Sequence, residues 1–75
     1  MSDIDHLLST AYALDNKGQR AASVAGIKAA LEADAALLAS AQAKLVELNS
    51  LIEVRGKQAC AFSTKYWEYL TEALA

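Results

Sequence analysis

Residues able to do chemistry are few in this 75-residue chain, and they are far apart in the sequence. A cysteine nucleophile needs a base beside it, but Cys60 and the single histidine, His6, lie near opposite ends of the chain. One histidine and one cysteine also fall short of the roughly four nitrogen or sulfur ligands of a structural zinc site. We therefore expect no catalytic residue, no metal and no cofactor, and a protein that is not an enzyme.

Phosphate and nucleic-acid binding also have little support. The Arg55–Lys57 stretch resembles the end of a P-loop, but Leu51 stands where the first glycine of that loop is required. Basic residues gather loosely in two places: Lys17, Arg20 and Lys28, then Arg55, Lys57 and Lys65. Neighbouring acidic residues offset both groups, and the net charge is −2, so we expect little attraction to phosphate backbones. A small nucleic-acid-binding regulator that uses these basic helix ends remains an alternative.

The composition places these residues on helices. Alanine and leucine are abundant, there is no proline, and there are only three glycines. We expect an all-α chain with one domain over residues 1–75, made of a short, a long central and a medium helix. The predicted bounds are about 3–16, 19–55 and 57–74.

Local signals support the ends of these helices. Ser2 and Asp5 have the spacing of a capping box at the first helix. Gly18 suits the left-handed position that follows a helix end, and Gly56 is the second stop signal, either a turn or only a kink.

The central helix carries an apolar heptad seam. Its members are Val24, Ile27, Leu31, Asp34, Leu38, Ala41, Leu45, Leu48 and Ile52. At about 1.5 Å per residue this helix would be about 50 Å long, which predicts an elongated bundle. The alternative is a break within residues 32–35, with Asp34 as an N-cap. In the unbroken helix Asp34 either sets the register against Lys28 or Lys44 of another chain, or reaches water.

A second pattern, of small residues, runs along the opposite side of the central helix. Small residues let another helix approach closely, although an exposed helix can also simply be rich in alanine. No charged residue occurs from Ala35 to Ala43, whereas exposed helix faces usually carry charge. We expect an antiparallel homodimer, with leucines inside each chain and alanines across the interface. The predicted interface residues are Ala29, Ala33, Asp34, Ala36, Leu38, Ser40 and Ala43.

Four of the five aromatic residues lie between residues 62 and 69. Helical spacing places Phe62, Tyr66, Tyr69 and Leu70 on one arc, which we expect to pack in the core. Trp67 lies on a flank with Cys60 and Leu74, and this flank packs within the chain, packs against a second copy, or anchors a foreign protein. The partner-binding candidates are Trp67, Cys60, Leu74 and Tyr69.

These features favour a protein-interaction module. The acidic N-terminus, the single cysteine and the short uncharged stretches favour a cytoplasmic protein, prokaryotic or viral, with no membrane segment. The layout resembles, in general shape only, small helical adaptors, secretion chaperones and phage-encoded inhibitors. We expect a homodimer that binds an unidentified protein and masks, inhibits or stabilises it. A purely structural coiled-coil oligomer is the other alternative.

Overall fold

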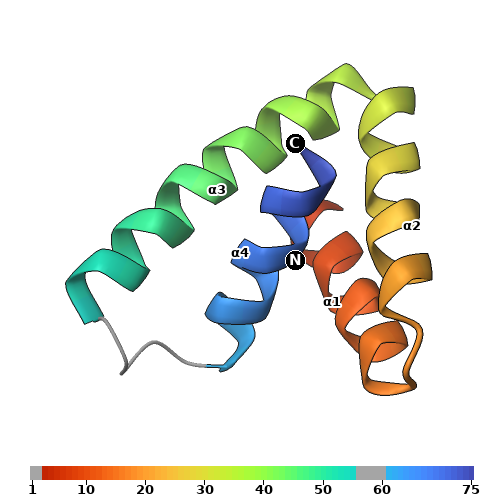
Figure 1. Ribbon diagram of the computed structural model, residues 1–75. Helices are drawn as coiled ribbons and strands as arrows, with labels where there is room; N and C mark the ends of the chain where they lie inside the picture. The colour runs from red at the N-terminus through yellow and green to blue at the C-terminus, as the bar shows by residue number, and fades with distance from the viewer. Residues whose placement is uncertain (1–2, 56–60) are drawn as a thin grey trace.

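The computed structural model describes residues 3–55 and 61–75, and all regular structure in them is helical. The elements are α1 (Asp3–Asn16), α2 (Arg20–Ala33), α3 (Ala35–Arg55) and α4 (Ala61–Ala73), as Figure 1 shows. The prediction of an all-α chain is confirmed. Gly56, Lys57 and Cys60, and the Ser2 cap, lie outside the described residues.

The turn from α1 to α2 follows the predicted glycine signal. Gly18 has a φ of 80°, a left-handed conformation that costs glycine little. Its N–H donates to the Asp15 carbonyl at 2.9 Å, and the Gln19 N–H donates to the Leu14 carbonyl at 3.0 Å. These two bonds form a Schellman motif, which satisfies carbonyls at the end of α1.

The predicted central helix over residues 19–55 is wrong, because Asp34 divides it into α2 and α3. Asp34 has an extended backbone, with φ −140° and ψ 106°. Its Oδ1 atom accepts hydrogen bonds from the N–H groups of Ala36 at 3.0 Å and Leu37 at 3.1 Å. Asp34 is therefore the N-cap of α3, as the alternative interpretation of the sequence held. The described residues form four helices instead of three.

The break makes the molecule compact, so the predicted elongated bundle is also wrong. The radius of gyration is 11.7 Å and the extents are 33 × 28 × 25 Å. A compact 75-residue chain should have a radius near 11 Å. Its 4724 Å² of accessible surface is close to the roughly 4,450 Å² that a compact monomer of this mass exposes.

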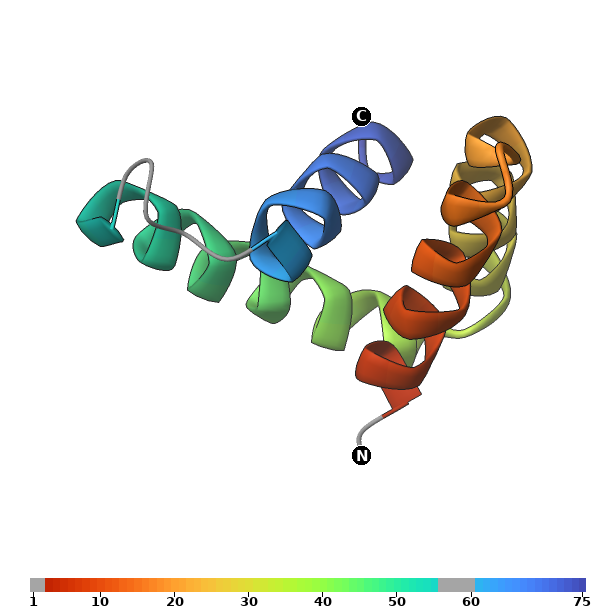
Figure 2. The same cartoon turned by 90° about the horizontal axis from the view of Figure 1, so that it is seen from below.

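Helix α4 holds the arrangement together. Figures 1 and 2 show α1 and α2 side by side, α3 leaving the end of α2 at a corner, and α4 in the angle between them. Every pair of the four helices is in contact.

The core lies where the four helices meet. Its largest fully buried side chains include Leu8 of α1, Ile27 of α2, Leu48 of α3, and Tyr69 and Leu70 of α4. Ile27, Leu31, Ala41 and Leu48 of the predicted heptad seam are buried, whereas its polar member, Asp34, is exposed. The expectation of leucines inside is confirmed.

Phe62 is the exception among the residues expected in the core, because its side chain is 54% exposed. It lies near the start of α4, at the edge of the bundle. Its ring centroid is 4.8 Å from that of Tyr12 in α1 and 6.2 Å from that of Tyr66. Helical spacing correctly predicted the side of α4 on which Phe62 lies. The bundle ends before it can cover this side chain.

Candidate functional site

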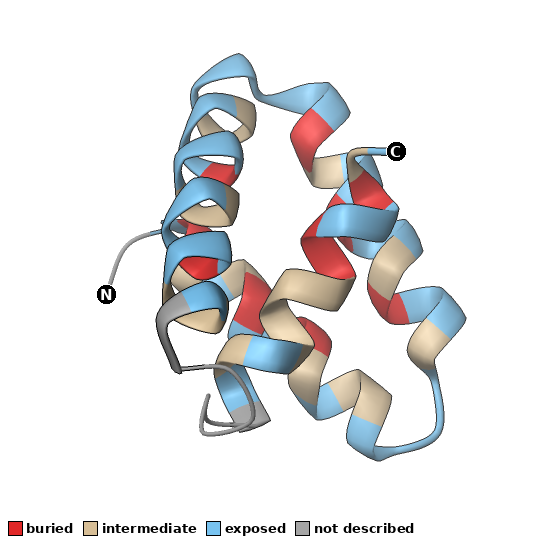
Figure 3. Cartoon of the chain, turned by 60° about the vertical axis from the view of Figure 1, so that its left-hand side comes forward, coloured by how far each residue is buried: buried red, intermediate tan, exposed pale blue. Residues whose placement is uncertain are grey.

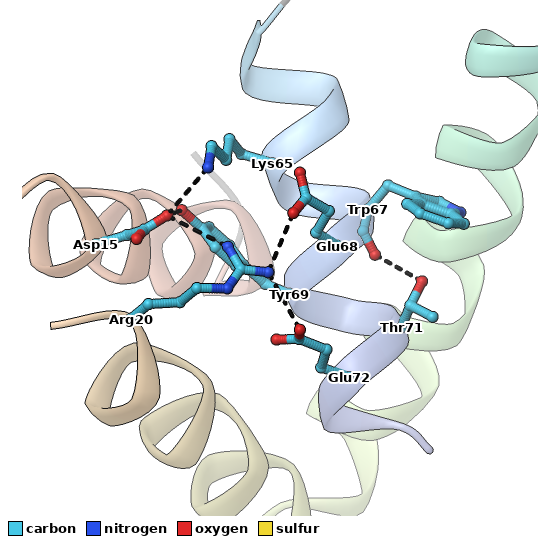
Figure 4. Close-up of polar contacts among 8 residues, drawn as sticks. All are labelled: Asp15, Arg20, Lys65, Trp67, Glu68, Tyr69, Thr71 and Glu72. Atoms are coloured by element: carbon cyan, nitrogen blue, oxygen red, sulfur yellow. Dashed lines mark hydrogen bonds and ion pairs between the residues drawn. The ribbon is translucent and has the colours of Figure 1, made fainter. Parts of the chain in front are cut away.

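The richest group of polar side chains ties α1, α2 and α4 together (Figure 4). Arg20, at the start of α2, contacts three carboxylates: Asp15 at 3.4 Å, Glu68 at 3.1 Å and Glu72 at 3.2 Å. We call the whole group the Asp15–Arg20 cluster, and its members are Asp15, Arg20, Lys65, Glu68, Tyr69 and Glu72.

Tyr69 is the buried centre of this cluster. Its side chain is fully buried, and its hydroxyl donates a hydrogen bond to Oδ2 of Asp15. The Arg20 guanidinium lies over the Tyr69 ring, 5.2 Å from the centroid, at a distance that favours a cation–π interaction. Lys65 approaches the same Asp15 oxygen at 3.6 Å.

The cluster shifts the pKa values of its members in opposite directions. The hydrogen bond from Tyr69 lowers the pKa of Asp15, and the positive charges of Lys65 and Arg20 add to this effect. Burial raises the pKa of Tyr69, and the hydrogen bond to the Asp15 carboxylate adds to this shift. At neutral pH the ionised carboxylate and the neutral phenol are therefore the stable forms, and the cluster acts as a structural tie.

The same contacts bear on the nucleic-acid alternative. Arg20 and Lys65 are two of the cations that could attract phosphate, and both pair with carboxylates of their own chain. A nucleic acid would have to displace these carboxylates, and the acidic residues around Arg20 would oppose its approach.

A second, smaller ion pair joins α1 to α3. Lys44 contacts Asp5 at 3.2 Å and Glu47 at 3.5 Å. Lys44 therefore has two carboxylate partners within its own chain, and its charge is balanced without Asp34 of another chain. These three residues border a shallow hollow of about 290 Å³, which Ile4, Ser40 and Ala43 also line.

The outward side of α3 differs from these two groups, because it is exposed and carries no charge. Figure 3 shows a long exposed band on this side of the helix. We call it the α3 face, and its members are Ala35, Ala36, Ala39, Ser40, Gln42, Ala43 and Val46. None of them carries a charge, and the Val46 side chain is 70% exposed. An uncharged apolar patch on a helix surface is typical of an interaction site.

The residues predicted for the dimer interface are divided between two helices. Ala29 and Ala33 are exposed on α2, whereas Ala36, Ser40 and Ala43 are exposed on α3. The corner at the exposed Asp34 means that one straight partner helix cannot run along both groups. Leu38 differs from these residues, because it is partly buried and packs against the core.

The partner-binding candidates also have different positions. Tyr69 is fully buried, so its side chain offers no surface to a partner in this monomer. Trp67 and Leu74 are partly buried against the core, and the indole N–H of Trp67 donates to Oδ1 of Asn49 in α3. Cys60 lies outside the described residues. The indole N–H of Trp67 therefore already has a partner within the chain.

Sequence reasoning missed Val46 and misplaced Phe62. A signal for Val46 was available: from Ala36, Ser40 and Ala43, one further step of three residues reaches it. Its exposure follows from Leu45 and Leu48, which turn inward on either side of it.

The part of the chain that the structure describes holds neither a metal-binding cluster nor a membrane-spanning helix. Within residues 3–55 and 61–75, no group of three or more histidine, cysteine, aspartate or glutamate side chains is arranged to hold a metal ion. None of the helices in this part of the chain combines the length and the apolar character that crossing a bilayer requires. No protein-family model, no curated protein sequence and no solved structure matches this chain.

Proposed function

We propose that this chain is a non-enzymatic helical module that forms a homodimer and binds another protein, which it masks, inhibits or stabilises. The proposal rests on the exposure of two large apolar side chains, Val46 and Phe62, which are 70% and 54% exposed on different helices. Exposed side chains of this kind, set among other apolar residues, favour binding surfaces.

Self-association is assigned to the α3 face. This face has no charge to desolvate, and its small side chains let a second helix approach closely. The compact monomer already buries its leucine seam, so association does not have to complete the core. We therefore expect a dimer of separately folded monomers.

Binding of a foreign protein is assigned to the aromatic cluster of Tyr12, Phe62 and Tyr66. The Tyr12 and Tyr66 rings meet edge to face at 6.4 Å, and Phe62 leans on both. Rigid aromatic side chains combine a large contact area with little loss of rotamer freedom, which makes them frequent interface anchors. Phe62 replaces Trp67 as the leading candidate, because it is the more exposed of the two.

Sedimentation velocity between about 1 and 200 µM tests the dimer, and an 8 kDa monomer throughout would contradict it.

Affinity capture from a native lysate tests the foreign partner, with Phe62→Ser compared against Thr64→Ala, an exposed position on the same helix. We expect Phe62→Ser alone to lose the captured protein. Equal capture by both variants would exclude the aromatic cluster. Salt-sensitive binding to a DNA duplex would instead support the nucleic-acid alternative.

A further inference from the structure

We infer that Asp34 is a hinge, and that at high concentration two copies of this chain exchange halves through it. In the exchanged form α2 and α3 join into one helix, so α1 and α2 of each copy pack on α3 and α4 of the other. No new surface is needed, because each half is covered by the same elements as in the monomer. The exchange goes beyond the proposed homodimer, whose monomers stay separately folded.

The break between α2 and α3 depends on a single residue. Helix α2 ends at Ala33 and α3 begins at Ala35, and between them only Asp34 has an extended backbone. Glycine and proline are the residues that most often end a helix, and neither occurs from Ile27 to Arg55. A break with no such residue, in a stretch rich in alanine and leucine, is a hinge that can close into a continuous helix.

A continuous helix would satisfy the backbone groups at the break. The N–H groups of Ala36 and Leu37 now donate to the Asp34 carboxylate at 3.0 and 3.1 Å. In a continuous helix they would donate to the carbonyls four residues earlier, those of Glu32 and Ala33. Joining the helices also removes the C-terminus of α2, where Glu32 lies and no basic residue balances the helix dipole.

The apolar seam keeps its register through the hinge. Leu31, Asp34 and Leu38 are spaced by three and then four residues, which places them on one side of a continuous helix. Leu31 is buried and Leu38 is packed against the core, so both halves of the seam already face inward in the monomer. A continuous helix would present both halves on the same side, where the second copy supplies the elements that cover them.

Specific contacts join the two halves of the chain. Arg20 of α2 contacts Glu68 and Glu72 of α4 at 3.1 and 3.2 Å, and Lys44 of α3 contacts Asp5 of α1 at 3.2 Å. Both α1 and α2 also pack against both α3 and α4. In the exchanged form these contacts lie between copies, so the second copy completes the core and the polar clusters.

Asp34 and dilution together favour the monomer. The Asp34 carboxylate caps α3 only while the hinge is bent. In the exchanged form the two long helices cross at their hinges, which brings the two Asp34 charges close together and disfavours pairing. Mass action opposes these effects as the protein concentration rises. Removing the Asp34 carboxylate should therefore convert the chain to the exchanged dimer.

Substitution of Asp34 tests the hinge. Asp34→Leu removes the cap and continues the apolar seam, so we expect a folded dimer at about 20 µM. A cap contributes a factor of about 5 for each chain, so the loss of two caps should shift the monomer–dimer equilibrium at least about 25-fold. Asp34→Asn keeps an oxygen acceptor and is the matched control, which should sediment as the wild-type chain does. Circular dichroism checks that both variants are folded.

A distance within one chain separates the exchange from the proposed homodimer. In a Cys60→Ser background, Ala22→Cys and Ser50→Cys place spin labels at exposed positions of α2 and α3. These positions lie about 42 Å apart in a continuous helix, whereas the longest extent of the monomer is 33 Å. Pulsed electron paramagnetic resonance, with the labelled chain diluted into unlabelled chain of the same variant, measures this distance. We expect the longer distance in Asp34→Leu and the shorter one in Asp34→Asn.

The wild-type chain gives the second measurement. Refolding from urea at about 1 mM should produce a dimer fraction with the longer distance, and refolding at about 5 µM should not. The shorter distance alone, either in Asp34→Leu or in the wild type refolded at 1 mM, overturns the hinge. A dimer that keeps the shorter distance overturns the hinge and leaves the proposed homodimer standing. A dilute wild-type monomer, together with the longer distance at 1 mM and in Asp34→Leu, supports the hinge and contradicts the proposed homodimer.

Discussion

The Asp15–Arg20 cluster and the α3 face use side chains in opposite ways. In the cluster, residues from three helices satisfy one another, and Tyr69 is fully buried beneath them. On the α3 face, the Val46 side chain is 70% exposed to solvent. The difference teaches that polarity alone does not mark a functional site here. The charged group ties the helices together, and the uncharged face is left exposed.

The largest expected effect is the loss of unfolding free energy when Tyr69 is removed from the Asp15–Arg20 cluster. Tyr69→Ala leaves a cavity in the core and should cost about 3–5 kcal/mol of unfolding free energy, as large-to-small aromatic substitutions do. Urea unfolding followed by circular dichroism measures this cost. Val46→Ala, studied at a concentration where the protein is monomeric, should change stability by no more than about 0.5 kcal/mol. Similar losses in the two variants would contradict the contrast.

Removing the N-cap of α3 at the break between α2 and α3 should have a smaller effect on the free energy of unfolding. Asp34→Ala removes the acceptor for two N–H groups in the first turn of α3 and should cost about 1 kcal/mol. Asp34→Asn keeps an oxygen acceptor and should cost much less. Urea unfolding of the two variants side by side checks the cap, and equal stabilities would show that the break does not depend on it.

The buried hydroxyl of Ser23 gives a further test of how polar groups affect the stability of this fold. Ser23 of α2 is 1% exposed, and within residues 3–55 and 61–75 its hydroxyl has no hydrogen-bond partner. Ser23→Ala removes an unpaired polar atom from an apolar site and should raise stability by about 1 kcal/mol. Thermal unfolding measures the gain. A loss of stability would mean that the hydroxyl finds a partner in solution.

Acid should weaken the cluster and spare the α3 face. The pKa of Asp15 is lowered below its ordinary value of 3.8, so its contribution to stability is present above pH 3.8 and is lost as pH falls through the lower, folded value. Urea midpoints between pH 2 and 7 should show this loss, and Asp15→Asn should reduce it. Dimerisation through the uncharged α3 face should change little while the chain stays folded.

Alkaline pH tests the other half of the same pair. Burial raises the pKa of Tyr69 above its ordinary value of 10.0, so stability is complete below pH 10 and falls as the pH rises further. In Tyr69→Phe, which keeps the ring and lacks the phenol, this alkaline loss should be smaller. An unchanged alkaline limb would contradict the role of this hydroxyl.

Much of the local structure was predictable, because its causes are local. Gly18 ends α1 through a left-handed backbone that the residue type itself favours. The heptad spacing of Ile27, Leu31 and Leu48 correctly gave the side of the chain that packs inward. The break at Asp34 was visible only as an alternative, since the apolar spacing continues through it in the same register.

The candidate surfaces were only partly predictable. The charge-free stretch from Ala35 to Ala43 predicted most of the α3 face, but the pattern of small residues joined this face to Ala29 and Ala33, which lie on α2. Phe62 has the spacing of a core residue, and its exposure depends on where the bundle ends. Contacts of Arg20 with Glu68 and Glu72 join residues 48 and more positions apart, which helical periodicity does not address.

The sequence by itself determined the helical class, the end of α1 at Gly18 and the inward direction of the leucine seam, because these follow from backbone preference and from the spacing of apolar side chains. Tertiary structure alone decided the rest. Once Asp34 caps α3, the chain turns a corner, and α4 fills the angle that results. That packing buries Tyr69 against Asp15 and leaves Val46 in solvent, because burial depends on which helices meet and not on residue type.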